Sequence, residues 1–125
     1  MTKECIKSMT DFVDRFCRGK FKVLDIGSCD VNENVGNNRS ICKDWEYIGA
    51  DICGGNNVNI VLEDVYKWDF QDNEFDVVIS SNTFEHIEFP WLTITEMARV
   101  LKPNGYLCIL VPLVCPTHGH PIDTY

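Results

Sequence analysis

Acidic and small polar residues in this sequence stand directly after short apolar runs, and the arrangement recurs along the chain. They are Asp25 with Gly27, Asp51, Asp64, and Ser81 with Asn82. A glycine after a strand lets backbone N–H groups approach a ligand, and a carboxylate after the next strand suits the two hydroxyls of a ribose. A strand followed by an ordinary glycine turn explains the first stretch equally well. Taken together, the positions favour a nucleoside-bearing ligand.

Imidazole groups are the other candidates for chemistry. His86 lies four residues after Asn82, where a histidine can accept a proton from a nucleophile. The alternative is a histidine at the start of a helix whose ring the backbone satisfies. His118 and His120, with Asp123, resemble a set of metal ligands, but a loop over the mouth of the substrate site is the simpler interpretation. We therefore expect a proton acceptor at His86 and no metal site.

The elements that must position these residues alternate between strands and helices. Apolar runs predict strands over residues 23–26, 46–51, 58–62, 75–80 and 106–111. Helices are predicted over 3–18, within 31–43, and from 90 to a stop at 102–105. In the last helix Ile94, Met97, Ala98 and Leu101 form the expected buried face. The connection between the second and third strands is short, so we expect a stunted crossover there.

This alternation is typical of a parallel α/β sheet with right-handed crossovers. Such a sheet brings the residues that follow its strands to one edge, which is where ligands bind. The acidic and polar positions described above all fall at that edge. The elements and the chemistry therefore agree on one predicted site.

Length and charge limit the class of protein. The chain has 125 residues, with 11 basic and 19 acidic side chains and a formal net charge of −8. This length predicts a single domain over residues 1–125. The negative charge disfavours nucleic acid and anionic membranes as partners, unless a local basic patch exists. We find no membrane span or secretory leader, and the seven cysteines are scattered singly, which favours reduced thiols in a soluble cytoplasmic protein.

Four motifs resemble, in order and spacing, those of the class I S-adenosylmethionine-dependent methyltransferases. They are residues 23–27 (VLDIG), 48–51 (IGAD), 75–86 (FDVVISSNTFEH) and 98–107 (ARVLKPNGYL). The resemblance implies a Rossmann-like, mostly parallel sheet with the strand order 3-2-1-4-5. It also implies that S-adenosylmethionine is the cofactor and that a methyl group is transferred to an acceptor, for which we expect a small molecule.

The same resemblance implies a role for each matching position. It places Asp25, Gly27 and Ser28 at the methionine and ribose region, Asp51 at the ribose hydroxyls, Ile52 on adenine, Asp64 and Val65 at the adenine amine, and Ser81 and Asn82 beside the sulfonium. Catalysis in such enzymes is mainly positioning, and His86 is the expected catalytic residue where a proton must be removed.

The sequence differs from the family pattern in two ways. Cys29 and Val31 stand where a second and a third glycine are usual. Family members also add a sixth and a seventh strand, so we expect a truncated sheet. Its fifth strand would then be an apolar edge, which favours pairing of two copies in a homodimer.

Two alternatives to a methyltransferase remain at this point. A dinucleotide-dependent oxidoreductase is disfavoured because G-x-G-x-x-G is absent after the first strand. The second alternative is a cofactor-binding or partner-binding module that does not catalyse, and the missing final strands favour it.

Overall fold

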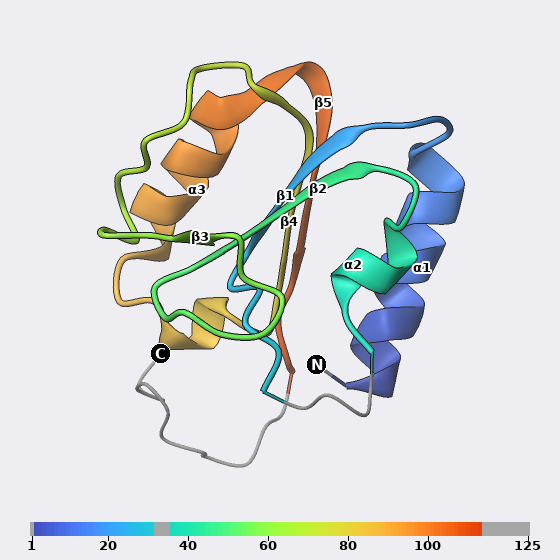
Figure 1. Ribbon diagram of the computed structural model, residues 1–125, viewed down its shortest axis with the longest axis horizontal. Helices are drawn as coiled ribbons and strands as arrows, with labels where there is room; N and C mark the ends of the chain where they lie inside the picture. Colours follow the sequence, from blue (N-terminus) through green and yellow to red (C-terminus); the bar gives the residue numbers. More distant parts are fainter. Residues whose placement is uncertain (1, 32–35, 114–125) are drawn as a thin grey trace.

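The computed structural model describes residues 2–31 and 36–113, which form a parallel sheet with helices on both faces (Figure 1). The elements are α1 (Lys3–Phe16), β1 (Lys22–Ile26), α2 (Asn38–Ile41), β2 (Glu46–Asp51), β3 (Ile60–Val61), β4 (Phe75–Ser81), the 3₁₀ helix η1 (Phe84–His86), α3 (Pro90–Val100) and β5 (Leu101–Leu110). All strand pairs are parallel, and the order is β3-β2-β1-β4-β5. The predicted Rossmann-like sheet and its strand order are confirmed.

The helices form two layers, with α1 and α2 on one face of the sheet and α3 on the other (Figure 1). The Thr2 hydroxyl caps α1 by accepting the Cys5 N–H at 3.2 Å. The Asn37 side chain caps the short α2 by accepting the Ser40 N–H at 3.1 Å. Pro90 begins α3. A proline is tolerated there because the first N–H groups of a helix make no intrahelical hydrogen bond.

Strand β1 separates two hydrophobic clusters, because successive side chains of a strand point to opposite faces. Val23 belongs to the cluster under α1, together with Met9. Leu24 and Ile26 belong to the cluster on the α3 side. Asp25 alternates with these neighbours, so its side chain falls on the same face as Val23. The carboxyl group is therefore enclosed between the sheet and α2.

The third helix buries only part of the predicted face. Its buried residues are Thr93, Met97 and Val100, whereas Ile94 is 40% exposed. Thr93 can be buried because its hydroxyl donates a hydrogen bond to the carbonyl oxygen of Val65 at 3.3 Å. Met97 is buried as predicted, but Ile94 and Ala98 are exposed. The predicted face omitted Thr93 because it counted only apolar residues.

Three element boundaries also differ from the predictions. Strand β5 begins at Leu101, and residues 102–105 form a bulge within it, since Phe75 pairs with Leu101 and Val77 with Tyr106. Strand β3 covers only Ile60–Val61. The first helix ends at residue 16 instead of 18. No helix separates β2 from β3, as predicted, and this short connection leaves β3 with two paired positions.

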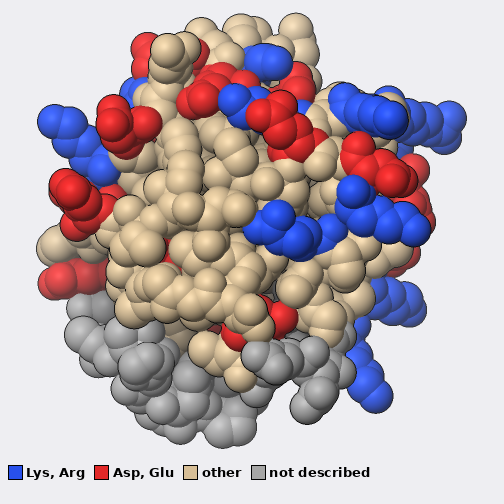
Figure 2. Space-filling view, viewed as in Figure 1, with Lys and Arg blue, Asp and Glu red and all other residues tan. Residues whose placement is uncertain are grey.

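The surface charges are mixed. Figure 2 shows Lys and Arg side chains gathered mainly over the α1 and α2 side, with Asp and Glu side chains among them. This view shows no extended surface of positive charge. Within residues 2–31 and 36–113, no helix has the length and apolar character that crossing a lipid bilayer requires.

Candidate cofactor site

Asp25 is the most deeply enclosed of the predicted site residues, with 2% of its surface exposed. One carboxylate oxygen, Oδ2, accepts hydrogen bonds from the Tyr47 hydroxyl and, at 3.0 Å, from the Asn38 side-chain amide. The other oxygen, Oδ1, is buried and has no hydrogen-bond partner in the described part of the chain. Burial raises the pKa of Asp25 to about 7, although the bonds from Tyr47 and Asn38 act to lower it.

Asn38 connects Asp25 to a second predicted residue. Its side-chain nitrogen also donates to the Ser81 hydroxyl at 3.3 Å, so one amide joins β1, α2 and the end of β4. The Asn38 side-chain oxygen is buried without a partner among the described residues, like Oδ1 of Asp25. Asp25 and Asn38 are hydrogen-bonded to each other, and each has one buried oxygen that accepts no hydrogen bond from the described residues. Burying such acceptors costs free energy unless a ligand or water donates to them.

Gly27 makes the turn that follows β1, with φ of +76°. A Cβ atom at this position would lie 2.0 Å from the Thr83 hydroxyl oxygen. Thr83 therefore fills the space beside the turn, and its hydroxyl donates to the carbonyl oxygen of Ser81 at 3.2 Å. The glycine is required both by its left-handed backbone and by this close approach.

Asp51 lies between the two loops that follow β1 and β2. Its Oδ2 atom accepts the Cys29 N–H at 2.9 Å, and its Oδ1 atom accepts the Cys53 N–H at 3.1 Å. Each carboxylate oxygen has a further lone pair, so these two bonds leave capacity for hydroxyl donors. Burial, with Asp51 nearby, raises the pKa of the Cys29 thiol. The carboxylate thus orders both loops around itself.

The loop after β2 folds back across β2 at Gly49. A Cβ atom on Gly49 would lie 2.2 Å from the Asn57 carbonyl oxygen, so only glycine allows this approach. The Asn57 side-chain amide donates to the Ser28 carbonyl oxygen at 3.0 Å and to the Tyr47 hydroxyl at 3.1 Å. Asn57 therefore ties the loop after β2 to the loop after β1 and to the hydroxyl that holds Asp25.

Asn82 follows β4 in the left-handed region, with φ of +54°. Its side-chain oxygen accepts a hydrogen bond from the Cys5 thiol at 3.2 Å. The first turn of α1 therefore reaches the loop after β4, next to the position that the family resemblance gives to the sulfonium. The sequence carried no signal for this contact, because 77 residues separate the two partners.

His86 closes the short η1 helix. Its Nε2 atom lies 3.9 Å from Oε1 of Glu85, and both side chains are mostly buried. The other Glu85 oxygen, Oε2, is buried without a hydrogen-bond partner among the described residues. The Thr83 carbonyl oxygen accepts the His86 N–H at 3.0 Å, so the backbone holds this turn directly after Asn82. The catalytic role of His86 stays a prediction.

The three residues predicted to contact adenine are exposed or half-buried. Ile52 is 47% exposed, and Asp64 is exposed with Oδ1 accepting the Tyr66 N–H at 2.7 Å. Val65 is half-buried and packs against the core on the α3 side. These positions follow β2 and β3 at the same sheet edge as the residues above. Their contact with a nucleobase stays a prediction.

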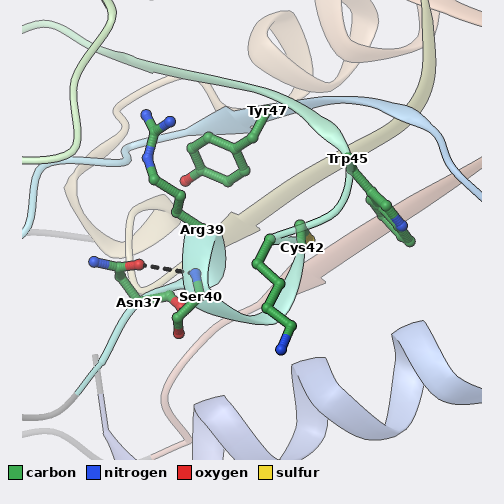
Figure 3. Close-up of a pocket in the computed structure, with 7 residues that line it drawn as sticks. Asn37, Arg39, Ser40, Cys42, Trp45 and Tyr47 are labelled. Carbon is green, nitrogen blue, oxygen red and sulfur yellow. Dashed lines mark hydrogen bonds between the residues drawn. The ribbon is translucent and has the colours of Figure 1, made fainter.

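A cavity of about 490 Å³ lies beside α2 (Figure 3). Its lining residues are Asn37, Arg39, Ser40, Cys42, Lys43, Trp45 and Tyr47. Arg39 lies over the Tyr47 ring, with 4.3 Å between Cζ and the ring centroid, and donates to the Asn57 side chain at 2.6 Å. None of the predicted cofactor residues lines this cavity, and Tyr47 connects it with Asp25.

Metal ligation has no candidate in the part of the chain that the structure describes, where no three His, Cys, Asp or Glu side chains are suitably gathered. His118, His120 and Asp123, which the sequence offered as an alternative metal site, lie outside the described residues. The six described cysteines are free thiols.

Sequence reasoning missed the residues that support the predicted ones. They are Cys5, Asn38, Tyr47, Asn57 and Thr83. Tyr47 can be found once the register of the strands is known. Because β1 and β2 pair Val23 with Tyr47, and Asp25 follows Val23 by two residues, Tyr47 and Asp25 must share one face of the sheet.

Comparison with known proteins decides the family. The sequence profile described as "Methyltransferase domain" matches residues 24–109, which is more than half of the chain. The chain belongs to this methyltransferase family. The matched segment runs from β1 to β5 and contains every predicted cofactor residue and His86.

Relatives of known sequence agree with this assignment. An uncharacterized methyltransferase of Schizosaccharomyces pombe is 40% identical over 53 residues, which are 42% of this chain and 19% of the relative. One from Mycobacterium tuberculosis is 45% identical over 52 residues, 41% of this chain and 20% of the relative. The aligned segments thus span about one fifth of these curated relatives.

Solved structures share the fold. A protein of Pyrococcus horikoshii superposes with a TM-score of 0.63 and 25% identity, over 84% of this chain and 56% of that one. A SAM-dependent methyltransferase of Methanosarcina mazei superposes with a TM-score of 0.61 and 19% identity, over 77% of this chain and 54% of that one. These structures have the same fold as this chain.

The described residues fit such a cofactor. Asp25 Oδ1 and the Asn38 side-chain oxygen are buried acceptors without donors, and the cofactor's ammonium group carries three donors. The Asp51 carboxylate has acceptor capacity left for ribose hydroxyls. Gly27 and Gly49 allow Thr83 and the Asn57 carbonyl group to pack closely against the backbone beside the two carboxylates.

Proposed function

We propose that this chain binds S-adenosylmethionine at the carboxyl edge of β1, β2 and β4 and serves methyl transfer to a small-molecule acceptor. The observation that carries the proposal is the pair of buried, unpartnered acceptors on Asp25 and Asn38, set within a methyltransferase domain. When bound, the cofactor supplies an activated methyl group on a positively charged sulfur. Asp25, Gly27 and Ser28 would hold its amino-acid end, and Asp51 would hold its ribose.

The protein's own part in the reaction is positioning. Asn82 is held by the Cys5 thiol and a left-handed backbone, so the first turn of α1 borders the end of the site where the acceptor would enter. His86 would take a proton from an acceptor that must lose one. Glu85, close to the His86 ring, would orient it.

A binding comparison tests the ligand class. S-adenosylmethionine and S-adenosylhomocysteine are expected to bind at least tenfold more tightly than NAD, because no G-x-G-x-x-G turn follows β1 to receive a pyrophosphate. Titration calorimetry with the three ligands measures this directly. Equal or tighter binding of NAD would refute the methyltransferase proposal. Binding of S-adenosylmethionine without methylation of any acceptor would favour the non-catalytic cofactor-binding module.

The outer edge of β5 leads to a second proposal, a homodimer. Tyr106 and Leu107 of this strand are more than one third exposed, and β4 is its only strand neighbour among the described residues. An apolar edge with unpaired backbone groups favours pairing with a second copy. We expect sedimentation over a concentration series to show dimers and β5 amides to exchange slowly in them. A monomer at all concentrations, with rapidly exchanging β5 amides, would contradict this.

A further inference from the structure

The buried carboxyl group of Asp25 is held in an unusual way, by two donors on one oxygen and by none on the other. The Tyr47 hydroxyl and the Asn38 amide both donate to Oδ2, while Oδ1 has no partner among the described residues. Asn38 is itself 4% exposed, and its side-chain oxygen also lacks a donor. The two side chains thus fix the carboxyl group in place and leave an acceptor pair to be satisfied.

The charge state of this carboxyl group depends on its burial and on opposing influences from β2 and α2. Burial raises the pKa of Asp25 to about 7, and Asp51 on β2 adds to the rise. The hydrogen bonds from Tyr47 on β2 and Asn38 on α2, together with the nearby Arg39 guanidinium, lower it. The Cys42 thiol on the α2 side also faces the carboxyl group, and the burial of this thiol, with Asp25 near it, raises its pKa to about 12.

Tyr47 acts as a donor at every ordinary pH. Burial and the neighbouring Asp25 raise the pKa of its hydroxyl, so this group does not lose its proton before Asp25 does. Asn57 supports the hydroxyl by donating to it at 3.1 Å. The titrating group of the cluster is therefore the Asp25 carboxyl.

We propose that Asn38 and Tyr47 are positioning residues that keep the Asp25 carboxyl group balanced between its neutral and ionised forms. A ligand with an ammonium group then expels a proton from this carboxyl group on binding. Such a ligand binds more tightly as the pH rises through neutrality. The inference rests on the proposed function, because it takes the ammonium group to be that of the cofactor. Below neutrality the neutral carboxyl gives its proton to the buffer as the ligand arrives, and a carboxylate–ammonium pair forms. Above neutrality the carboxylate is already present and no proton is released.

Calorimetry with S-adenosylhomocysteine at pH 6, 7 and 8 tests this proton-linked binding. At each pH the titration is repeated in buffers with different heats of ionisation, which gives the number of protons released. If only the ionised form binds, the dissociation constant is expected to rise about tenfold from pH 8 to pH 6, with close to one proton released at pH 6. 5′-Methylthioadenosine, which has the nucleoside but no ammonium group, is expected to bind with little pH dependence.

Two variants separate positioning from general stability. Tyr47→Phe removes one donor from the carboxylate, so the pH at which affinity falls is expected to move upward, with nearly full affinity recovered at pH 9. Asn38→Leu, similar in size, removes the other donor and is expected to move this pH in the same direction. It also removes the Asn38 side-chain oxygen, so a loss of affinity at every pH is expected in addition to the shift. Tyr106→Phe, on β5 and outside the site, is the matched control and is expected to leave the pH profile unchanged. Thermal unfolding verifies that each variant is folded.

The outcomes distinguish the two proposals. S-adenosylhomocysteine binding with no pH dependence and no proton release would overturn this inference and leave the proposed function standing. A uniform loss of affinity at every pH in both Tyr47→Phe and Asn38→Leu would also overturn it, since that result indicates a purely structural role. No binding of S-adenosylhomocysteine at any pH would overturn the proposed function and the inference together.

Discussion

The Asp25→Asn protein is expected to be more stable than the parent at pH 8 and to bind S-adenosylhomocysteine about 10- to 100-fold more weakly. Loss of a hydrogen bond to a charged group costs roughly 1.5–3 kcal/mol, which corresponds to that range of affinity. The gain in stability arises because the parent must keep a buried carboxyl group that becomes charged near pH 7. Asparagine has nearly the same shape and never ionises.

The sign of the effect follows from proton binding. Between its ordinary value of 3.8 and about 7, Asp25 holds a proton in the folded state that the unfolded chain has released. The parent's free energy of unfolding therefore falls as the pH rises through this window. The full difference corresponds to about 4 kcal/mol. The variant and the parent are expected to be equally stable near pH 4 and to differ most above pH 7.

Denaturant unfolding at pH 4, 6 and 8 measures this difference. Asp76→Asn provides a control of opposite sign. The pKa of Asp76 is lowered, first by the Lys22 N–H that it accepts at 2.8 Å and also by Lys102, so this substitution should cost stability above pH 4. If Asp25→Asn gains nothing at pH 8 relative to pH 4, Asp25 is not the buried, neutral-titrating group that the structure indicates.

Asp51→Ala is expected to weaken S-adenosylhomocysteine at least tenfold while unfolding stays cooperative. The substitution removes the acceptor for ribose hydroxyls, and charged hydrogen bonds are worth roughly 1.5–3 kcal/mol each before water compensates. It also releases the Cys29 and Cys53 N–H groups, which the carboxylate holds at 2.9 and 3.1 Å. The loops after β1 and β2 therefore lose their common anchor.

A milder variant separates these two contributions. Asp51→Asn keeps one side-chain oxygen as an acceptor and removes the charge, so we expect an affinity between those of the parent and Asp51→Ala. Asp44→Ala changes an exposed acid outside the site and is the control for lost negative charge. Calorimetry at pH 8 compares the four proteins. Parent-like affinity of Asp51→Ala would place the nucleoside elsewhere.

The fold class of this protein and its resemblance to the methyltransferases could be predicted from the sequence. Five short apolar runs, and the acidic or small polar residues near the ends of four of them, can be recognised locally, because strand formation and turn formation depend on neighbouring residues. The order and spacing of the motifs then indicated the strand order that the structure confirms. Asp25, Gly27, Asp51, Ser81 and Asn82 could be named for the same reason, since each lies at or next to the carboxyl end of a recognisable strand.

The boundaries of β5 and the buried face of α3 were not determined in this way. The bulge at residues 102–105 depends on the pairing of β5 with β4. Gly105 is needed because a Cβ atom there would lie 2.8 Å from the Asp76 carbonyl oxygen. Burial of Thr93 depends on an acceptor 28 residues away. Local periodicity carries no information about partners at that separation.

The residues that support the site could not be predicted, because they come from distant parts of the chain. Asn38 stands in an asparagine-rich stretch with no distinguishing pattern, yet α2 places it between Asp25 and Ser81, 13 and 43 residues distant. Tyr47 looked like an ordinary strand residue, and its hydroxyl reaches Asp25 only because β2 pairs in register beside β1. Whether a buried carboxyl group is charged depends on every donor and charge around it, and these come from segments that are neighbours only in the folded chain.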